Sequence, residues 1–287
     1  MTWFADRISR LRQRCRDFAL TSSVFWEARR VTLLYARTVA WRYSKLGDRD
    51  KSMRVLVKAS ARAIKSVADG ASPDAKAKIQ RLVARFVRQL PLDTKVGAKS
   101  VIITGYPRSG KSLLAGTLVR SHGYTHVRLD MLTRLYWNIE DDTLRDHTRR
   151  AILNALIKRF PKGLVIEGDD LISLNRSSRC MLPFSLATLK DLQRQRQLCC
   201  YVVGSAHATE EAKSEGFRRF RRTGECWTSR HKGWNDLGAR ARDYLSYNRE
   251  IYALAKRANI PFIEIDPLQF DASLSKAARE ISAKASE

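Results

Sequence analysis

The sequence predicts an α/β fold with a five-stranded parallel sheet, preceded by a basic all-α region. After residue 98, five short apolar runs alternate with amphipathic stretches, which is the pattern of strands joined by helical crossovers. A glycine-bearing loop follows the first of these runs. Before residue 95 glycine is rare, no strand-like run occurs, and apolar residues recur at helical spacing.

The basic region covers residues 1–95 and is predicted to form three or four amphipathic helices. Residues 1–97 contain 22 basic and 8 acidic residues, a surplus that supplies more than half of the net charge of +25. Such a surplus favours an anionic partner. Residues 1–95 are therefore expected to bind nucleic acid or an anionic membrane surface.

The α/β domain is predicted over residues 98–287, after a linker at 91–99. Its first strand is expected to be a buried strand of a parallel sheet, because residues 100–104 form a short β-branched run. The predicted strands are 100–104, 125–130, 163–168, 198–204 and 260–265. The predicted helices are 111–121, 143–160, 183–196, 209–222 and 237–258.

The most specific functional signal lies between the first predicted strand and the next helix. The segment Gly-Tyr-Pro-Arg-Ser-Gly-Lys-Ser fits the pattern G-x-x-x-x-G-K-[ST], in which glycines let backbone N–H groups wrap around phosphate. Lys111 is expected to reach the β- and γ-phosphates of ATP, and the Ser112 hydroxyl to ligate Mg²⁺. The predicted nucleotide-binding residues are Gly105, Tyr106, Pro107, Arg108, Ser109, Gly110, Lys111, Ser112 and Leu113.

Acidic residues follow the third predicted strand, in the segment Glu167-Gly168-Asp169-Asp170. The carboxyl ends of parallel strands are where open α/β sheets bind ligands. Glu167 is therefore expected to hold Mg²⁺ through water, together with Ser112, or to contact the acceptor. Asp169 and Asp170 compete for either role, and a surface acidic turn is the remaining alternative.

Two further candidates for catalysis are Asp130 and Arg222. Asp130 ends the second predicted strand, where a carboxylate can accept the proton of an acceptor hydroxyl; alternatively it caps the next helix. Arg222 closes the run Arg218–Arg222 and is the preferred cation to stabilise the developing charge from a mobile element. A solvated basic helix face is the alternative for this run.

These motifs resemble those of the small P-loop kinases, which include nucleoside monophosphate, shikimate and gluconate kinases, polynucleotide kinase, and relatives of zeta toxin and chloramphenicol phosphotransferase. The resemblance covers residues 98–270 and rests on the Gly105–Ser112 loop, Asp130, the Ile166-Glu167-Gly168 segment and the arginine-rich run. It implies a P-loop NTPase fold with five parallel strands and an acid ending the second strand as the base. The chain lacks the Asp-Gly-Phe-Pro-Arg segment of adenylate kinases, so the resemblance leaves the acceptor open.

The function predicted first is an ATP-dependent phosphotransferase that moves the γ-phosphoryl group to a small-molecule hydroxyl, with Mg²⁺ as cofactor. The charge also favours a polynucleotide 5′-hydroxyl kinase or another enzyme acting on nucleic acid. A non-catalytic, NTP-dependent switch with a basic partner-binding arm is the third alternative. A cytoplasmic location is expected, since the five cysteines are scattered and no apolar run approaches the roughly 20 residues that span a bilayer.

Overall fold

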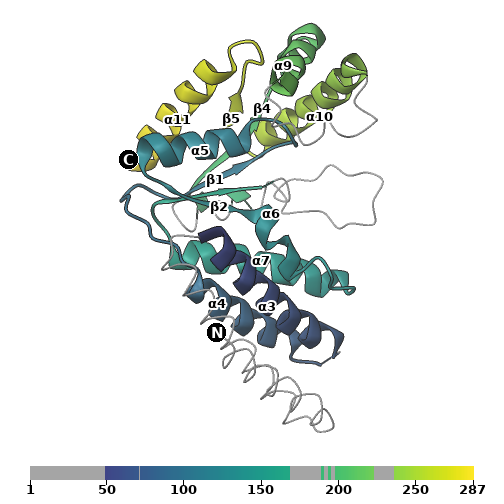
Figure 1. The fold of residues 1–287 in the computed structure, drawn as a ribbon, viewed down its shortest axis with the longest axis vertical. Helices are drawn as coiled ribbons and strands as arrows, with labels where there is room; N and C mark the ends of the chain where they lie inside the picture. Colours follow the sequence, from purple (N-terminus) through teal and green to yellow (C-terminus); the bar gives the residue numbers. More distant parts are fainter. Residues whose placement is uncertain (1–48, 71, 169–188, 191–192, 195–197, 223–235) are drawn as a thin grey trace, which may run out of the picture. The chain divides into compact units, whose positions relative to one another are not determined.

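The structure is a computed structural model that describes residues 49–70, 72–168, 189–190, 193–194, 198–222 and 236–287 (Figure 1). The chain divides into two compact units. The first comprises Met1–Pro91 and Arg134–Thr148, and the second comprises Leu92–Thr133 and Arg149–Glu287. Residues 134–148, which lie within the predicted α/β domain, are thus grouped with the N-terminal unit. The predicted helices before residue 49 lie outside the described residues, as does most of 183–196.

In the first unit, two amphipathic helices pack against each other: α3 (Arg49–Asp69) and α4 (Ala75–Gln89). Apolar side chains at helical spacing are buried, while most of the basic side chains are turned to solvent. The buried apolar residues include Met53, Leu56, Val57, Ile64, Val67, Ile79, Val83, Phe86 and Val87. The helical prediction is confirmed for these two stretches.

The second unit is built on a five-stranded sheet in which all strands are parallel. The strands are β1 (Val101–Thr104), β2 (Thr125–Arg128), β3 (Leu164–Glu167), β4 (Cys199–Gly204) and β5 (Phe262–Glu264). All residues of β1, β3 and β4 are buried, as expected for central strands covered on both faces. The predicted α/β class and the five-stranded parallel sheet are therefore confirmed.

Helices α5 (Lys111–His122) and α11 (Phe270–Ser286) pack together on one face of the sheet (Figure 1). The core between these helices and the sheet contains Val101, Ile103, Leu114, Leu118, Val165, Val203, Leu274, Ala278 and Ile281. Helix α10 (Leu237–Arg257) packs against β4 and β5, and also against α9 (Glu210–Arg222). Helix α7 (Asp142–Arg159) precedes β3 and runs from the first unit into the second.

The strand order is β2-β3-β1-β4-β5, so β1 lies at the centre of the sheet. The chain passes from β1 to the β2 edge, returns to β3, and then moves to the opposite side of β1 for β4 and β5. At such a switch point the loops after neighbouring strands diverge and leave a crevice at their carboxyl ends. The loop that follows β1 therefore occupies the position where parallel sheets bind ligands.

The structure corrects the predicted end of the second strand. Strand β2 stops at Arg128, and Asp130 lies in the first turn of the short helix α6 (Leu129–Leu132), which continues into the 3₁₀ turn η1 (Thr133–Leu135). The Thr133 hydroxyl donates a hydrogen bond to the carbonyl oxygen of Asp130 at 2.8 Å, which fixes this turn. Asp130 therefore follows the strand and does not end it. Among the described residues, no helix is long and apolar enough to cross a membrane.

We expect Ser100→Ala to lower the free energy of unfolding by about 1–3 kcal/mol, the cost of leaving buried polar groups unpaired. The fully buried Ser100 hydroxyl donates to the carbonyl oxygen of Phe160 at 2.8 Å and accepts from the Leu164 N–H at 3.0 Å. It thereby ties the chain before β1 to the start of β3. Urea denaturation followed by circular dichroism measures the change. The control is Ser286→Ala, whose exposed hydroxyl bonds only within α11 and which should leave stability unchanged.

Candidate functional site

The turn between β1 and α5 brings the backbone of the loop against β4. Gly105 has φ 148°, and a methyl group there would lie 2.1 Å from the carbonyl oxygen of Val203, so this position accepts only glycine. Gly110, at φ 92°, directly precedes α5, and a side chain there would crowd the Phe270 ring. Arg108 also has a positive φ, of 68°, which is uncommon for a residue with a side chain. The loop is therefore tightly curled.

Lys111 folds back across this loop. Its side chain is only 5% exposed, and its ammonium group donates to the carbonyl oxygen of Tyr106 at 2.8 Å and lies 3.5 Å from the Ser109 hydroxyl. The Ser109 N–H also donates to the Tyr106 carbonyl, at 3.2 Å. A cation is thus held within the curl, beside the first turn of α5. The N-terminal end of a helix carries unpaired N–H groups and a partial positive charge, so this arrangement attracts anions.

The carboxylate of Glu167 lies next to the first turn of α5, at the end of β3. The Ser112 hydroxyl donates to its Oε1 atom at 3.1 Å, so the two predicted metal ligands lie together although 55 positions separate them in the chain. The Glu167 side chain is only 2% exposed. Two atoms of basic side chains, Nε2 of His126 and Nε of Arg128, each lie 3.5 Å from its Oε1 atom. Asp169 and Asp170, the competing candidates, lie outside the described residues.

Glu167 stays ionised despite its burial. Burial acts to raise the pKa of this carboxyl, but His126, Lys111 and Ser112 together hold the pKa below its ordinary value. Among the described residues, no group of three or more His, Cys, Asp or Glu is arranged to hold a metal ion. A metal at Ser112 and Glu167 would therefore need ligands from a bound anion or water, which is how Mg²⁺ is usually held.

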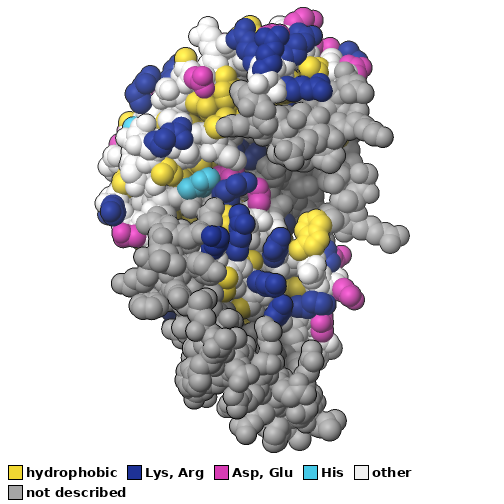
Figure 2. All heavy atoms as spheres, in the orientation of Figure 1, with side chains coloured by type: hydrophobic (Ala, Val, Ile, Leu, Met, Phe, Trp, Pro, Cys, Tyr) yellow, Lys and Arg dark blue, Asp and Glu magenta, His cyan; other side chains and the backbone are white. Residues whose placement is uncertain are grey.

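Asp130 and Arg222 occupy less enclosed positions. The Asp130 side chain is half exposed, and the guanidinium of Arg128 lies 3.9 Å from its Oδ2 atom, so Arg128 stands between Asp130 and Glu167. Arg222 is the exposed last residue of α9. Figure 2 shows Lys and Arg side chains gathered at the top of the view, where Figure 1 places α9. Two members of the run, Arg218 and Arg219, both pair with Glu215 at 3.2 Å.

Aromatic contacts hold the first half of the loop against α9 and α10. The Tyr106 ring stacks on Tyr247, with centroids 4.9 Å apart, and meets the edge of Tyr244 at 5.7 Å. The Arg108 guanidinium lies 5.8 Å from the centre of the Phe217 ring. Pro107 and Leu113, which were also predicted to bind nucleotide, are exposed on the loop and on α5. The loop is thus fixed by α9 and α10 as well as by its own hydrogen bonds.

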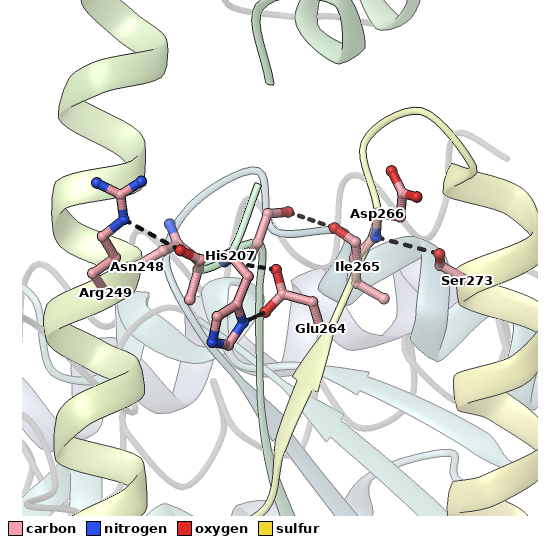
Figure 3. Close-up of polar contacts among 9 residues, drawn as sticks. His207, Asn248, Arg249, Glu264, Ile265, Asp266 and Ser273 are labelled. Atoms are coloured by element: carbon pink, nitrogen blue, oxygen red, sulfur yellow. Dashed lines mark hydrogen bonds and ion pairs between the residues drawn. The ribbon is translucent and has the colours of Figure 1, made fainter. Parts of the chain in front are cut away.

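A second polar cluster at the carboxyl edge was not predicted (Figure 3). His207, just after β4, pairs with Glu264 at the end of β5: the backbone N–H and Nδ1 of His207 lie 3.0 and 2.9 Å from the carboxylate oxygens. The Arg249 Nε donates to the carbonyl oxygen of Ala206 at 3.3 Å. The signal available in the sequence was the segment Ile-Glu-Ile-Asp, in which an acid follows the apolar run of the last strand.

The described site therefore combines a curled, cationic loop at a helix N-terminus with a buried carboxylate beside the Ser112 hydroxyl. It is suited to binding a polyanion that brings a divalent cation with it. No protein-family model matches the chain, and no curated protein matches it at a significant level, so its function is inferred from this geometry.

Proposed function

We propose that the chain is an ATP-dependent phosphotransferase with a P-loop NTPase fold, which moves the γ-phosphoryl group of ATP to the hydroxyl group of a small molecule. The observation that carries the proposal is the loop from Gly105 to Gly110, which curls around the Lys111 ammonium at the start of α5. The full agreement of this loop with the phosphate-binding pattern, between a buried strand and a helix, supports the same reading.

In this proposal the loop N–H groups and Lys111 bind the β- and γ-phosphates. Ser112 and Glu167 would hold Mg²⁺, with Glu167 acting directly or through water. When bound, the metal would supply charge neutralisation for the transferred group, and Lys111 is placed to stabilise the charge that develops in the transition state. Because little covalent chemistry is required of the protein, positioning and electrostatics supply most of the catalysis.

The acceptor is proposed to enter on the β2–β3 side of the loop, where carboxylates and a cation are adjacent. Asp130 is the candidate base for the acceptor hydroxyl, and the guanidinium group of Arg128 lies 3.9 Å from its Oδ2 atom. A half-exposed carboxylate on a short helix can reorient toward a bound substrate. Arg222, at the end of α9, remains the candidate for a cation delivered by a mobile element.

A nucleic-acid acceptor or partner is the second candidate. Helix α3 carries one stripe of exposed basic side chains, spaced three or four residues apart: Lys51, Arg54, Lys58 and Arg62. The apolar face of the same helix is buried, which leaves the stripe as its solvent-facing surface. A row of cations on a rigid helix suits the regularly spaced phosphates of a polynucleotide.

Lys111→Ala tests the phosphate-binding loop. Loss of the ammonium group removes charge stabilisation from the transition state, and we expect phosphoryl transfer to fall by about 10²–10³-fold or to background. Labelled ATP offered to pooled metabolites and oligonucleotides, followed by mass spectrometry of the products, identifies the acceptor and measures transfer. Lys276→Ala, which removes a largely exposed lysine from α11, is the control. Unchanged transfer by a folded Lys111→Ala protein would refute the proposal.

Glu167→Gln tests the metal site. The amide keeps an oxygen that accepts from Ser112 but loses the charge, so we expect the Mg²⁺ concentration for half-maximal transfer to rise by about 10–100-fold. Titration of Mg²⁺ at fixed ATP gives this value. Glu280→Gln removes a largely exposed carboxylate from α11 and should leave the Mg²⁺ requirement unchanged. Equal Mg²⁺ curves for the Glu167 variant and the wild type would exclude Glu167 from the metal site.

Asp130→Asn tests the base. We expect kcat to fall by about 10²–10⁴-fold while the affinity for ATP stays the same, because a general base acts only in the transition state. Steady-state kinetics and calorimetric titration with ATP separate the two effects. Asp243→Asn, at an exposed position on α10, serves as the matched control. Normal turnover in the Asp130 variant would show that this carboxylate serves only the local structure of α6.

A further inference from the structure

A lysine is buried behind the phosphate-binding loop. Lys213 lies in the first turns of α9 and is only 5% exposed. Its ammonium group lies 3.8 Å from the centre of the Tyr244 ring, on α10, and 5.0 Å from that of Phe217, one turn further along α9. Aromatic rings attract a cation through their faces, but they replace only part of the hydration that a buried ammonium group loses.

The same two rings contact the loop. Phe217 also faces the guanidinium group of Arg108, and the edge of Tyr244 meets the ring of Tyr106. The rings of Phe217 and Tyr244 thus form a layer that contacts Lys213. Two loop residues, Tyr106 and Arg108, pack on the same two rings. No residue of this layer belongs to the proposed metal or acceptor site. A change of charge at Lys213 is therefore placed to act on the loop without touching the reacting atoms.

The charged and titratable groups that face Lys213 come from three elements. Arg108 approaches from the loop, Glu264 from the end of β5, and Tyr244 from α10. Burial, opposed by Glu264 and reinforced by Arg108, lowers the pKa of Lys213 to about 7. Glu264 is itself paired with His207 at 2.9 Å, so it does not serve Lys213 alone. Near neutral pH the lysine is therefore divided between its charged and neutral forms.

We propose that Lys213 takes up a proton when a polyphosphate occupies the loop from Gly105 to Gly110, and so acts as a positioning residue whose charge supports the occupied loop. This inference rests on the proposed function. A phosphate group near Arg108 offsets the positive charge that opposes protonation of Lys213, and it attracts the ammonium form directly through an interior of low dielectric. The two binding equilibria are linked. If a bound polyphosphate raises the affinity of Lys213 for its proton, protonation of Lys213 raises the affinity for the polyphosphate by the same factor.

The direction of the pH dependence follows from this coupling. Well below pH 7 the lysine is charged in both states, so binding takes up no proton at this site. Above about pH 7 it is charged only in the complex, and the affinity falls as the pH rises, by at most about tenfold per pH unit. The decline ends once the pH exceeds the pKa of Lys213 in the complex. The γ-phosphate of ATP titrates in the same range, so the effect must be compared between variants.

The test is calorimetric titration of the full chain with ATP and Mg²⁺, and separately with inorganic tripolyphosphate, at pH 6.5, 7.5 and 8.5. Each titration is repeated in buffers of different ionisation enthalpy, which counts the protons taken up. The variants are Lys213→Arg, which stays charged, and Lys213→Met, which stays neutral. Lys276→Met, on the exposed face of α11, is the control and should match the wild type.

We expect the wild type at pH 7.5 to 8.5 to take up more protons than either Lys213 variant, by up to one per ligand. Its affinity should decline with pH relative to that of Lys213→Arg, and Lys213→Met should bind more weakly than the wild type at pH 6.5. Equal proton uptake and parallel pH profiles in all proteins that bind would overturn the inference while leaving the phosphate-binding loop intact. A wild type that binds neither ligand at any pH would overturn both.

Because arginine is larger than lysine, the Lys213→Arg variant can fail to fold. In that case the protonation of Lys213 is measured directly in the wild type. In protein labelled with ¹³C at the lysine ε-carbon, the Lys213 signal is identified by its absence from Lys213→Met. Its titration with pH is then followed with and without tripolyphosphate. A midpoint that moves to higher pH on addition of tripolyphosphate supports the inference, and an unmoved midpoint refutes it.

Discussion

Between β1 and α5 the backbone passes so close to β4 that a methyl group at Gly105 would meet the carbonyl oxygen of Val203 at 2.1 Å. This approach determines where the rest of the loop can go. It turns the chain tightly enough for Lys111 to reach back to the carbonyl oxygen of Tyr106, and it directs the Tyr106 ring toward α10. The packing of β1 at the centre of the sheet keeps the turn in place, because β1 has a hydrogen-bonded neighbour on each side.

Two buried ionisable groups near this turn have opposite environments. Burial acts to raise the pKa of Glu167, but His126, Lys111 and Ser112 outweigh this effect and hold the pKa below its ordinary value. Lys213 has aromatic rings around it and a carboxylate that is shared with His207, so burial dominates. The pKa of the carboxyl is thus lowered, which favours its charged form, whereas the pKa of the lysine is lowered to about 7, which favours its neutral form. The difference comes from neighbours supplied by distant parts of the chain and not from depth of burial alone.

The sequence was most informative where the signal was local. The central strands β1, β3 and β4 could be predicted because each is a mostly apolar run, and the loop because its glycines and lysine have fixed spacing. The strand order, and with it the contact between Ser112 and Glu167, could not be derived from spacing because it depends on which strands pair. The second strand was predicted too long because an apolar residue such as Leu129 fits a buried position in a strand and in a helix equally well. The hydrogen bond from the Thr133 hydroxyl, which favours the helical turn, cannot be read from a pattern of apolar residues. The burial of Lys213 could not be predicted because most residues of its helix are charged, although Phe217 lies one turn away on the same face.

The strand order also bears on how the folded protein behaves at high concentration. The two strands at the edges of the sheet, β2 and β5, each pair with only one other strand of the sheet, and both are poor templates for pairing with another chain. Strand β5 has three residues and ends in Glu264, while β2 has four and carries His126 and Arg128. The long, apolar strand β4 lies one place inside the edge, where its hydrogen-bonding groups face β1 and β5. The strand order that puts the turn after β1 in the centre of the sheet therefore also keeps the long, apolar strand β4 away from the edges of the sheet.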